Sequence, residues 1–310
     1  MKKYLAASTY KNDRRSVVTI GTFDGVHMGH KAILKRLVET AKKEDLDAVV
    51  LTFFPHPRMV LQQKLDIKLI NTIDERTELL EKTGLNHLVI HPFTHAFSRL
   101  TALEYVRDIL VNSLKAKKVI IGYDHRFGRN RVANIEDLKE FGRTYNFEVE
   151  EISAKEIDDV AISSTKIRKA LNEGDVETAN NYLGYNFMIS GEIVKGKAIG
   201  RTINYPTANL KLKEDYKSIP KNGVYVVQAI IDGEKIYGIT SIGTNPTVGG
   251  KEKTIETFFL DFNKDLYNTE VTIEFLKHIR DEKNFESIEV LRQEILKDEH
   301  FAKLYLKQRE

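Results

Sequence analysis

VVTIGTFDGVHMGHKAILKRLVETA, residues 17–41, holds a short apolar run, a glycine-rich turn and a helical pattern in direct succession. The β-branched run Val17–Ile20 is typical of a buried parallel strand. Apolar residues then recur at helical spacing, at Ile33, Leu34, Leu37, Val38 and Ala41. In an open parallel sheet, ligands bind above the carboxyl ends of the strands, which is where Gly21–His30 lies. The free N–H groups of a helix N-terminus attract anions there, so this stretch predicts a phosphate site.

The turn itself carries residues suited to phosphate. His27 and His30 are three apart, share a face on the first helical turn and could both donate to phosphate oxygens. Gly21, Gly25 and Gly29 let the backbone approach a bulky ligand. A glycine-rich turn that merely holds two histidines is the alternative. The strand before it and the amphipathic helix after it favour function.

The first half of the chain continues to alternate strand and helix. Strand-like runs occupy residues 48–54, 87–93, 118–124 and 147–153. A capping box of Thr101 and Glu104 opens a helix, and another helix begins near Ser164. The first of these helices is expected to point four residues inward: Leu103, Val106, Leu110 and Leu114. This alternation predicts an α/β fold with a doubly wound parallel sheet, Rossmann-like in class.

Near Leu183 the pattern changes to strands with little helix between them. Asp232-Gly233 separates two alternating runs and predicts a tight hairpin. The tail from Phe285 to Leu306 returns to a helical pattern, with Ile288, Leu291 and Ile295 on one stripe. We therefore expect an antiparallel β-barrel with a terminal helix. The predicted domains are 1–184 and 185–310.

Composition limits the functional classes. The 310 residues are 41% hydrophobic and carry a net charge of +3, which argues against a dedicated nucleic-acid binder. The absence of cysteine excludes disulfides, thiolate metal sites and a cysteine nucleophile. With no signal peptide and no run of about 20 apolar residues, we expect a cytoplasmic protein that binds no membrane.

A second motif, ISSTKIRKAL at residues 162–171, also lies at a predicted helix start. Ser163, Ser164 and Thr165 can cap the helix and donate hydroxyls, and Arg168 is a fork-shaped phosphate donor. Alone, the segment could be a plain N-cap followed by a surface arginine. Together, the two motifs resemble the nucleotidylyltransferase superfamily, with its (H/T)xGH and ISSTxxR signatures.

The closer similarity is to the adenylyltransferase half of bacterial bifunctional riboflavin kinase/FAD synthetases. GTFDGVHMGH, TFFPHPR (52–58), GYDHRFGRNR (122–131) and SSTKIR follow the order of that family. The resemblance implies catalytic roles for His27, His30 and Arg168. It implies ATP binding by Gly21, Phe23, Asp24, His27, His30, Ser164, Thr165 and Arg168, and flavin binding by Phe54, Pro55, Asp124 and Phe127. Two positions depart from the family, His125 for Phe and Val132 for Gly.

The informative C-terminal segment is GEIVKGKAIGRTINYPTANL, residues 191–210. Its glycines and basic pair suit phosphates, although a hairpin loop with solvated lysines explains these residues equally well. The segment resembles the riboflavin kinase motif GxVxxGxxxGRxxGFPTANL, with Asn204-Tyr205 in place of Gly-Phe. This resemblance implies binding of ATP and Mg²⁺ by Gly196, Lys197, Gly200, Arg201, Thr207 and Asn209, the last two at the metal. It makes Glu256 the catalytic base, although by its pattern alone Glu256 could equally be an exposed strand residue. Arg280 is a weaker candidate for a flavin or phosphate contact, with a solvated strand-end arginine as the alternative.

The sequence thus predicts a bifunctional enzyme of flavin cofactor synthesis. Riboflavin would be phosphorylated to FMN, and FMN would receive an adenylyl group from ATP to give FAD and pyrophosphate. No nucleic acid or protein partner is implied. The alternatives are a class I aminoacyl-tRNA synthetase, a flavin-binding barrel without catalysis, and another small-molecule nucleotidylyltransferase attached to a non-catalytic flavin-binding barrel.

Overall fold

The structure is a computed structural model that describes residues 1–62, 67–153, 162–196, 200, 204–247 and 250–309. The chain divides by packing into two compact units, Met1–Ser163 and Ser164–Glu310. No helix among the described residues is long and apolar enough to cross a membrane.

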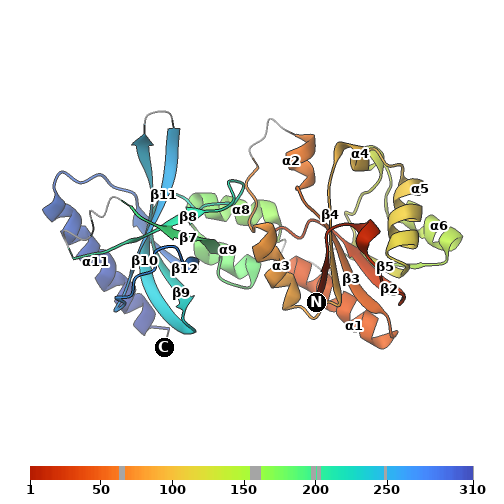
Figure 1. The fold of residues 1–310 in the computed structure, drawn as a ribbon, viewed down its shortest axis with the longest axis horizontal. Helices are drawn as coiled ribbons and strands as arrows, with labels where there is room; N and C mark the ends of the chain where they lie inside the picture. Colours follow the sequence, from red (N-terminus) through yellow and green to blue (C-terminus); the bar gives the residue numbers. More distant parts are fainter. Residues whose placement is uncertain (63–66, 154–161, 197–199, 201–203, 248–249, 310) are drawn as a thin grey trace. The chain divides into compact units, whose positions relative to one another are not determined.

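The first unit is built on a six-stranded parallel sheet in the order β1-β4-β3-β2-β5-β6 (Figure 1). Its strands are β1 (Lys2–Tyr4), β2 (Ser16–Ile20), β3 (Asp47–Phe53), β4 (His87–His91), β5 (Ala116–Gly122) and β6 (Glu148–Ile152). Its helical segments are η1 (Ala7–Thr9), α1 (Met28–Lys43), α2 (Pro57–Leu61), α3 (Ile73–Glu81), α4 (His95–Ser98), α5 (Ala102–Glu104), η2 (Tyr105–Ser113), η3 (Arg129–Arg131) and α6 (Ile135–Tyr145). The five predicted strands are confirmed. β1 is an additional edge strand that was not predicted, because its two lysines do not form an apolar run.

Helices cover both faces of this sheet, as predicted for a doubly wound fold. Alternate residues of β3 enter different cores: Val50 packs in the core beneath α1, whereas Val49 packs in the core beneath η2. The strand order reverses between β2 and β5, which is where such sheets bind ligands.

The helix after the Thr101–Glu104 capping box forms as expected, but one residue was placed wrongly. Val106, Leu110 and Leu114 are buried, whereas Leu103 is 45% exposed. One turn of α-helix passes directly into the π-helix η2, where Leu114 donates its N–H to the carbonyl of Ile109. The wider turn changes the spacing of the inward residues. A prediction based on the α-helical period therefore places Leu103, the first of the four, on the wrong face.

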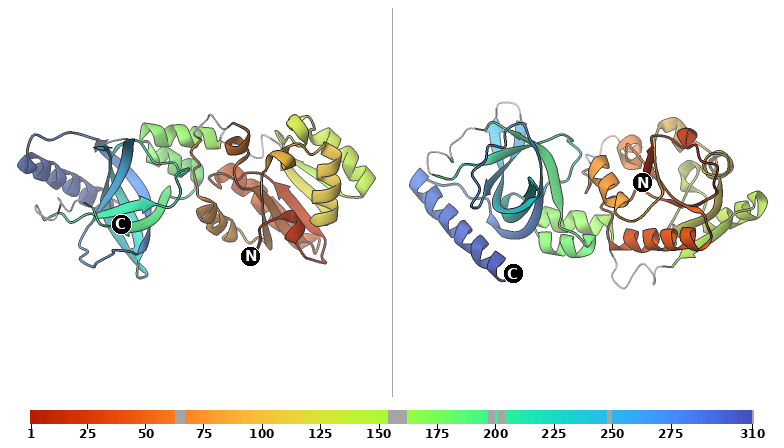
Figure 2. Two further views of the ribbon diagram at one scale, coloured as in Figure 1. Left: turned by 45° about the horizontal axis from the view of Figure 1, so that its top comes forward. Right: turned by 60° about the horizontal axis from the view of Figure 1, so that its bottom comes forward.

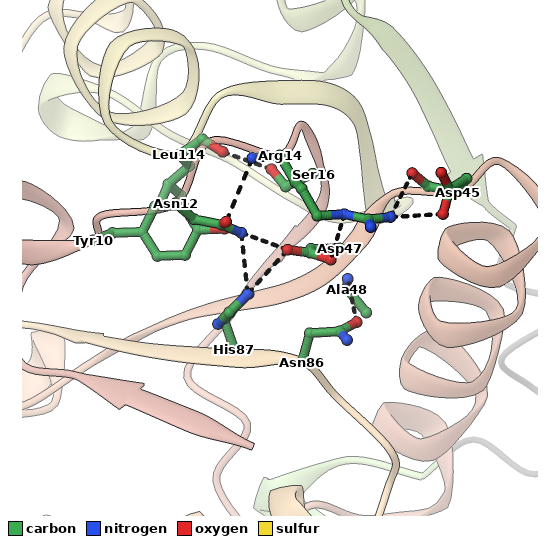
Figure 3. Close-up of polar contacts among 10 residues, drawn as sticks. All are labelled: Tyr10, Asn12, Arg14, Ser16, Asp45, Asp47, Ala48, Asn86, His87 and Leu114. Atoms are coloured by element: carbon green, nitrogen blue, oxygen red, sulfur yellow. Dashed lines mark hydrogen bonds and ion pairs between the residues drawn. The ribbon is translucent and has the colours of Figure 1, made fainter.

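A buried polar cluster closes the amino ends of the strands (Figure 3). Asp47 Oδ2 lies 3.1 Å from His87 Nε2, and Asn12 donates to the same carboxylate. Arg14 Nε approaches Asp47 Oδ1 at 3.3 Å and its other end pairs with exposed Asp45. This cluster joins the segment before β2 to the first residues of β3 and β4, at the end of the sheet opposite the predicted phosphate site.

The second unit is a closed antiparallel barrel in the order β10-β11-β8-β7-β12-β9, preceded by two helices and followed by a third (Figure 2). Its elements are α8 (Ser164–Glu173), α9 (Val176–Leu183), β7 (Met188–Val194), β8 (Ala208–Leu212), β9 (Gly223–Ile231), β10 (Glu234–Thr247), β11 (Gly250–Phe259), β12 (Glu270–Asp281) and α11 (Ile288–Lys307). Asp232 and Gly233 both have positive φ, which makes the turn between β9 and β10 the predicted tight hairpin.

The terminal helix α11 lies along the outside of the barrel (Figures 1 and 2). Ala302 of α11 enters a core with Val226, Ile239 and Leu276 of the barrel wall. Ile288, predicted on the apolar stripe, is 50% exposed because the helix begins there. The stripe instead includes the buried carboxylate of Asp298.

Candidate active sites

The loop that follows β2 has a strained backbone. Phe23, Gly25 and Val26 all have positive φ, at 49°, 90° and 36°. Glycine adopts such angles freely, but a β-branched valine does so rarely. Strain of this kind is held only where the surrounding structure demands a particular shape, and it is concentrated at functional sites. Here it turns the chain sharply between the carboxyl end of β2 and the N-terminus of α1.

His27 and His30 lie at the start of α1, as the sequence predicted. His27 is the N-cap, and its Nδ1 accepts the backbone N–H of His30 at 3.4 Å. Since Nδ1 accepts, a neutral His27 ring carries its proton on Nε2. The two rings stack with centroids 3.6 Å apart, and Phe23 meets His30 edge-on at 5.1 Å.

This environment keeps His30 neutral. Burial lowers the pKa of His30 well below its usual value, and the neighbouring charges of His27 and Arg76 lower it further. A neutral imidazole still has one N–H to donate. The pair can therefore offer hydrogen bonds to an anion without adding two buried positive charges.

Asp24 and Arg76 form a buried pair behind this loop. Asp24 Oδ1 accepts the backbone N–H groups of Ile70 and Asn71, at 2.9 and 3.3 Å. Arg76, 0% exposed, places its guanidinium 3.7 Å from the same oxygen. The sequence analysis did not single out Arg76. The capping box of Thr72 and Glu75 just before it could have located the helix that carries it.

The residues expected at the flavin follow the two strands that flank β2. Phe54, half-buried, and Pro55, exposed, come directly after β3, and exposed Asp124 comes after β5. Phe127 is buried in the core, where its ring lies 5.8 Å from that of Tyr105. Parallel strands place all four at the sheet edge that carries Gly21–His30. Their contact with flavin stays a prediction.

Ser164, Thr165 and Arg168 belong to the second unit, where α8 begins at Ser164 as predicted. Spacings of three and four residues put them on one side of the helix. The adjoining side of the helix is anchored by Ile167 and Leu171, which are fully buried. Thr165 is exposed and Arg168 is half-buried.

The barrel brings three of the predicted kinase residues together. Glu256 of β11 is directly opposite Asn209 of β8 in the strand register. The hydroxyl of Thr207 donates to Glu256 Oε2 at 3.1 Å. Ile255 and Thr257 are buried, so Glu256, which alternates with them, projects from the outer side of the wall. A hydroxyl, an amide and a carboxylate thus share one patch.

Two glycines that precede β8, Gly196 and Gly200, lie close to residues next to or in this patch. A Cβ added at Gly196 would come within 2.3 Å of the Asn209 amide, and one at Gly200 within 2.0 Å of the Tyr205 carbonyl oxygen. Only glycine allows the backbone to pass so closely. Lys197 and Arg201, the two predicted cations of this loop, lie outside the described residues.

Arg280 has protein partners in this fold. Its Nε and a terminal nitrogen donate to the two carboxylate oxygens of Asp298, at 3.0 and 2.8 Å. The pair ties β12 to α11. A contact between Arg280 and flavin stays a prediction.

The chain matches known families in both halves. A family model described as FAD synthetase matches residues 9–166, and one described as riboflavin kinase matches residues 183–306. Two curated relatives carry the name bifunctional riboflavin kinase/FMN adenylyltransferase. The protein of Buchnera aphidicola subsp. Schizaphis graminum is 38% identical and that of Listeria monocytogenes 36%, over 95% and 94% of both chains.

These matches define a two-domain nucleotidyl- and phosphotransferase of flavin metabolism. The chain belongs to the family of bifunctional riboflavin kinase/FMN adenylyltransferases.

A solved structure has the same fold over nearly the whole chain. It is named as a macrolide-efflux protein from Streptococcus pneumoniae, with a TM-score of 0.89 and 34% identity, and the match covers 97% of this chain and 98% of that one. That name concerns efflux, whereas both family models and the curated relatives name flavin enzymes.

Proposed function

We propose that the barrel phosphorylates riboflavin to FMN and that the parallel-sheet unit supplies the site that adenylates FMN to FAD, with ATP as the donor in both reactions. The observation that supports this most directly is the Thr207–Glu256 hydrogen bond beside Asn209 on the barrel wall. The carboxylate of Glu256 can accept a proton, and phosphoryl transfer to a hydroxyl benefits from such an acceptor within hydrogen-bond reach.

In the kinase reaction, Glu256 acts on the ribityl hydroxyl of riboflavin. Its carboxylate accepts the hydroxyl proton while the oxygen attacks the γ-phosphorus of ATP, and ADP leaves with the electrons of the broken P–O bond. Thr207 orients the carboxylate through its hydroxyl. Sequence similarity puts Lys197 and Arg201 at the phosphates.

The donor set of this patch fits Mg²⁺ carried by ATP. Thr207 and Asn209 would hold the ion through a hydroxyl and an amide oxygen, ligand types that hard cations prefer. When bound, Mg²⁺ neutralises charge on the phosphates.

In the adenylyl transfer, a phosphate oxygen of FMN attacks the α-phosphorus of ATP, and pyrophosphate leaves. Since the FMN phosphate is already a nucleophile at neutral pH, no strong base is needed. His27 and His30 would donate N–H groups to the nucleotide phosphates, beside the positive end of α1. Sequence similarity alone assigns Ser164, Thr165 and Arg168 to phosphate as well.

A reciprocal pair of variants tests this division of labour. Glu256→Gln should abolish FMN formation from riboflavin while FAD still forms from supplied FMN. His30→Ala should lower FAD formation by about 10²–10³-fold, as for loss of one donor at other charged transition states, and leave FMN formation unchanged. Chromatography of the flavins after incubation with ATP and Mg²⁺ measures both steps.

Exposed Glu192 of β7 provides a matched control, and Glu192→Gln should retain both activities. Retained riboflavin phosphorylation in Glu256→Gln would show that Glu256 is not the base. Equal loss of both activities in His30→Ala would contradict the assignment of the two steps.

Other parts of the functional assignment stay predictions from the sequence. They are release of pyrophosphate, the cytoplasmic location, and the lack of a nucleic-acid, membrane or protein partner.

A further inference from the structure

Tyr205 links the kinase patch to the terminal helix. It lies two residues before Thr207, is 7% exposed, and packs its ring edge-on against Phe258 at 4.9 Å. Its hydroxyl donates to Glu299 Oε2 of α11 at 2.9 Å. Burial, followed by the hydrogen bond to Glu299, raises the pKa of Tyr205 to about 12, so the phenol remains a donor at neutral pH.

The helix that receives this bond is itself fixed to the barrel. Asp298, next to Glu299, is buried and holds Arg280 of β12 through two hydrogen bonds. Glu299 also accepts from Lys303 one turn later on α11, at 2.7 Å. The carboxylate of Glu299 therefore belongs to a helix that is anchored to the barrel.

The position of Tyr205 couples it to the reacting groups. Tyr205 and Thr207 are two apart, as are Phe258 and Glu256 on the adjacent strand β11. Tyr205 contacts Phe258, and Thr207 bonds Glu256. Because only one residue separates Tyr205 from Thr207, a displacement of the Tyr205 ring would also displace Thr207 relative to Glu256.

The hydroxyl of Tyr205 is a departure of this chain from the family motif, which has Gly-Phe where this chain has Asn204-Tyr205. Asn204 has a φ of 64°, a left-handed conformation that costs asparagine more than glycine. The motif phenylalanine could pack on Phe258 in the same way but could not reach Glu299 by a hydrogen bond. Asn204 thus weakens the loop conformation, whereas the hydroxyl of Tyr205 adds a bond that holds it.

We propose that Tyr205 is a positioning residue of the kinase site, and that its bond to Glu299 makes α11 the support that holds the Thr207–Asn209 segment in register with Glu256. The proposal rests on the proposed kinase function of this patch.

The test compares the full-length protein with Tyr205→Phe, Glu299→Ala and the double variant. Loss of a hydrogen bond to a charged acceptor weakens the hold on the loop. We therefore expect the KM for ATP in riboflavin phosphorylation to rise about tenfold in each variant, with kcat changed less than about twofold. The Kd for MgADP, measured by calorimetry, should rise by the same factor. Because both single variants remove one bond, the double variant should be no weaker than either.

Tyr305→Phe is the matched control, since it removes a tyrosine hydroxyl of α11 that donates to the carbonyl of Leu276 in β12 at 3.3 Å, away from the loop. It should leave the KM and the Kd unchanged. Asn204→Gly added to Tyr205→Phe should restore most of the lost affinity by relieving the left-handed strain.

An unchanged KM and Kd in Tyr205→Phe, or additive effects in the double variant, would overturn the proposal. So would an equal effect of Tyr305→Phe, because that indicates general loss of helix packing. Riboflavin phosphorylation by Glu256→Gln would contradict the proposed function itself. If Glu256→Gln is inactive but Tyr205→Phe has an unchanged KM and Kd, only the present inference is contradicted.

Discussion

At the scale of single residues, His125 is a half-buried imidazole whose Nε2 atom is shielded from solvent. Its ring stacks on Phe127 with centroids 6.1 Å apart, and its Nε2 has no hydrogen-bond partner among the described residues. Burial lowers the pKa of His125 to about 4; Asp124 opposes this shift and Arg131 adds to it. At neutral pH the imidazole of His125 is therefore uncharged and packs as an aromatic ring.

This environment predicts acid sensitivity of the folded state. Below about pH 6.5 the unfolded chain binds a proton on this histidine that the folded chain does not, so stability should fall as pH drops from about 6.5 to about 4. His125→Phe should remove about 2 kcal/mol of that loss. Urea unfolding between pH 4 and 8 measures it, with exposed His95→Phe as the control. Identical pH profiles for wild type and His125→Phe would contradict the assignment.

At the scale of secondary-structure elements, sequence patterns predicted five strands of the first unit, the antiparallel barrel of the second and the start of α8, but not β8. Apolar runs and capping residues act locally, and so they can be recognised without the fold. The short edge strand β1 was missed because its stability comes from pairing with β4 rather than from its own residues. Arg76 was missed for a similar reason, since its importance depends on the loop that brings Asp24 to it.

The polar cluster at the amino ends of the strands illustrates a structural role for residues that resemble a catalytic set. Asp47, His87 and Asn12 are close enough for chemistry, but they lie at the opposite end of β3 from Phe54. We expect Asp47→Ala to destabilise the fold by about 1–3 kcal/mol, because it leaves buried donors without an acceptor. Both activities should persist at temperatures where the protein is folded.

Asp45→Ala is the matched control for this cluster. Asp45 pairs with the same Arg14 but its side chain is 94% exposed, so its loss should cost less than about 1 kcal/mol. Denaturant titration of the two variants compares them directly. Equal destabilisation would show that Asp47 contributes only surface charge.

At the scale of the whole molecule, the domain boundary predicted from the sequence differs from the boundary defined by packing. The sequence places a change from α/β to barrel at residues 184–185, and the family models leave residues 167–182 between them. Packing divides the chain at Ser163–Ser164 and assigns α8 and α9 to the barrel unit. A sequence pattern records what an element is, but not which core its apolar face enters.

The contacts of α9 with the barrel make this difference testable. Asn180 accepts the backbone N–H of Phe187 at 2.6 Å and donates to the carbonyl of Phe275 at 2.8 Å. A fragment that starts at residue 185 leaves the N–H of Phe187, just before β7, and the carbonyl of Phe275 in β12 without Asn180, and it exposes the apolar face covered by Leu183. We expect it to be at least about 3 kcal/mol less stable than a fragment that starts at residue 164, with a Tm lower by roughly 10 °C. Asn180→Ala in the longer fragment should fall between the two in thermal unfolding, since it removes the hydrogen bonds but keeps the apolar contacts. Equal Tm values for the two fragments would show that the barrel is complete without α8 and α9, and would favour the boundary predicted from the sequence.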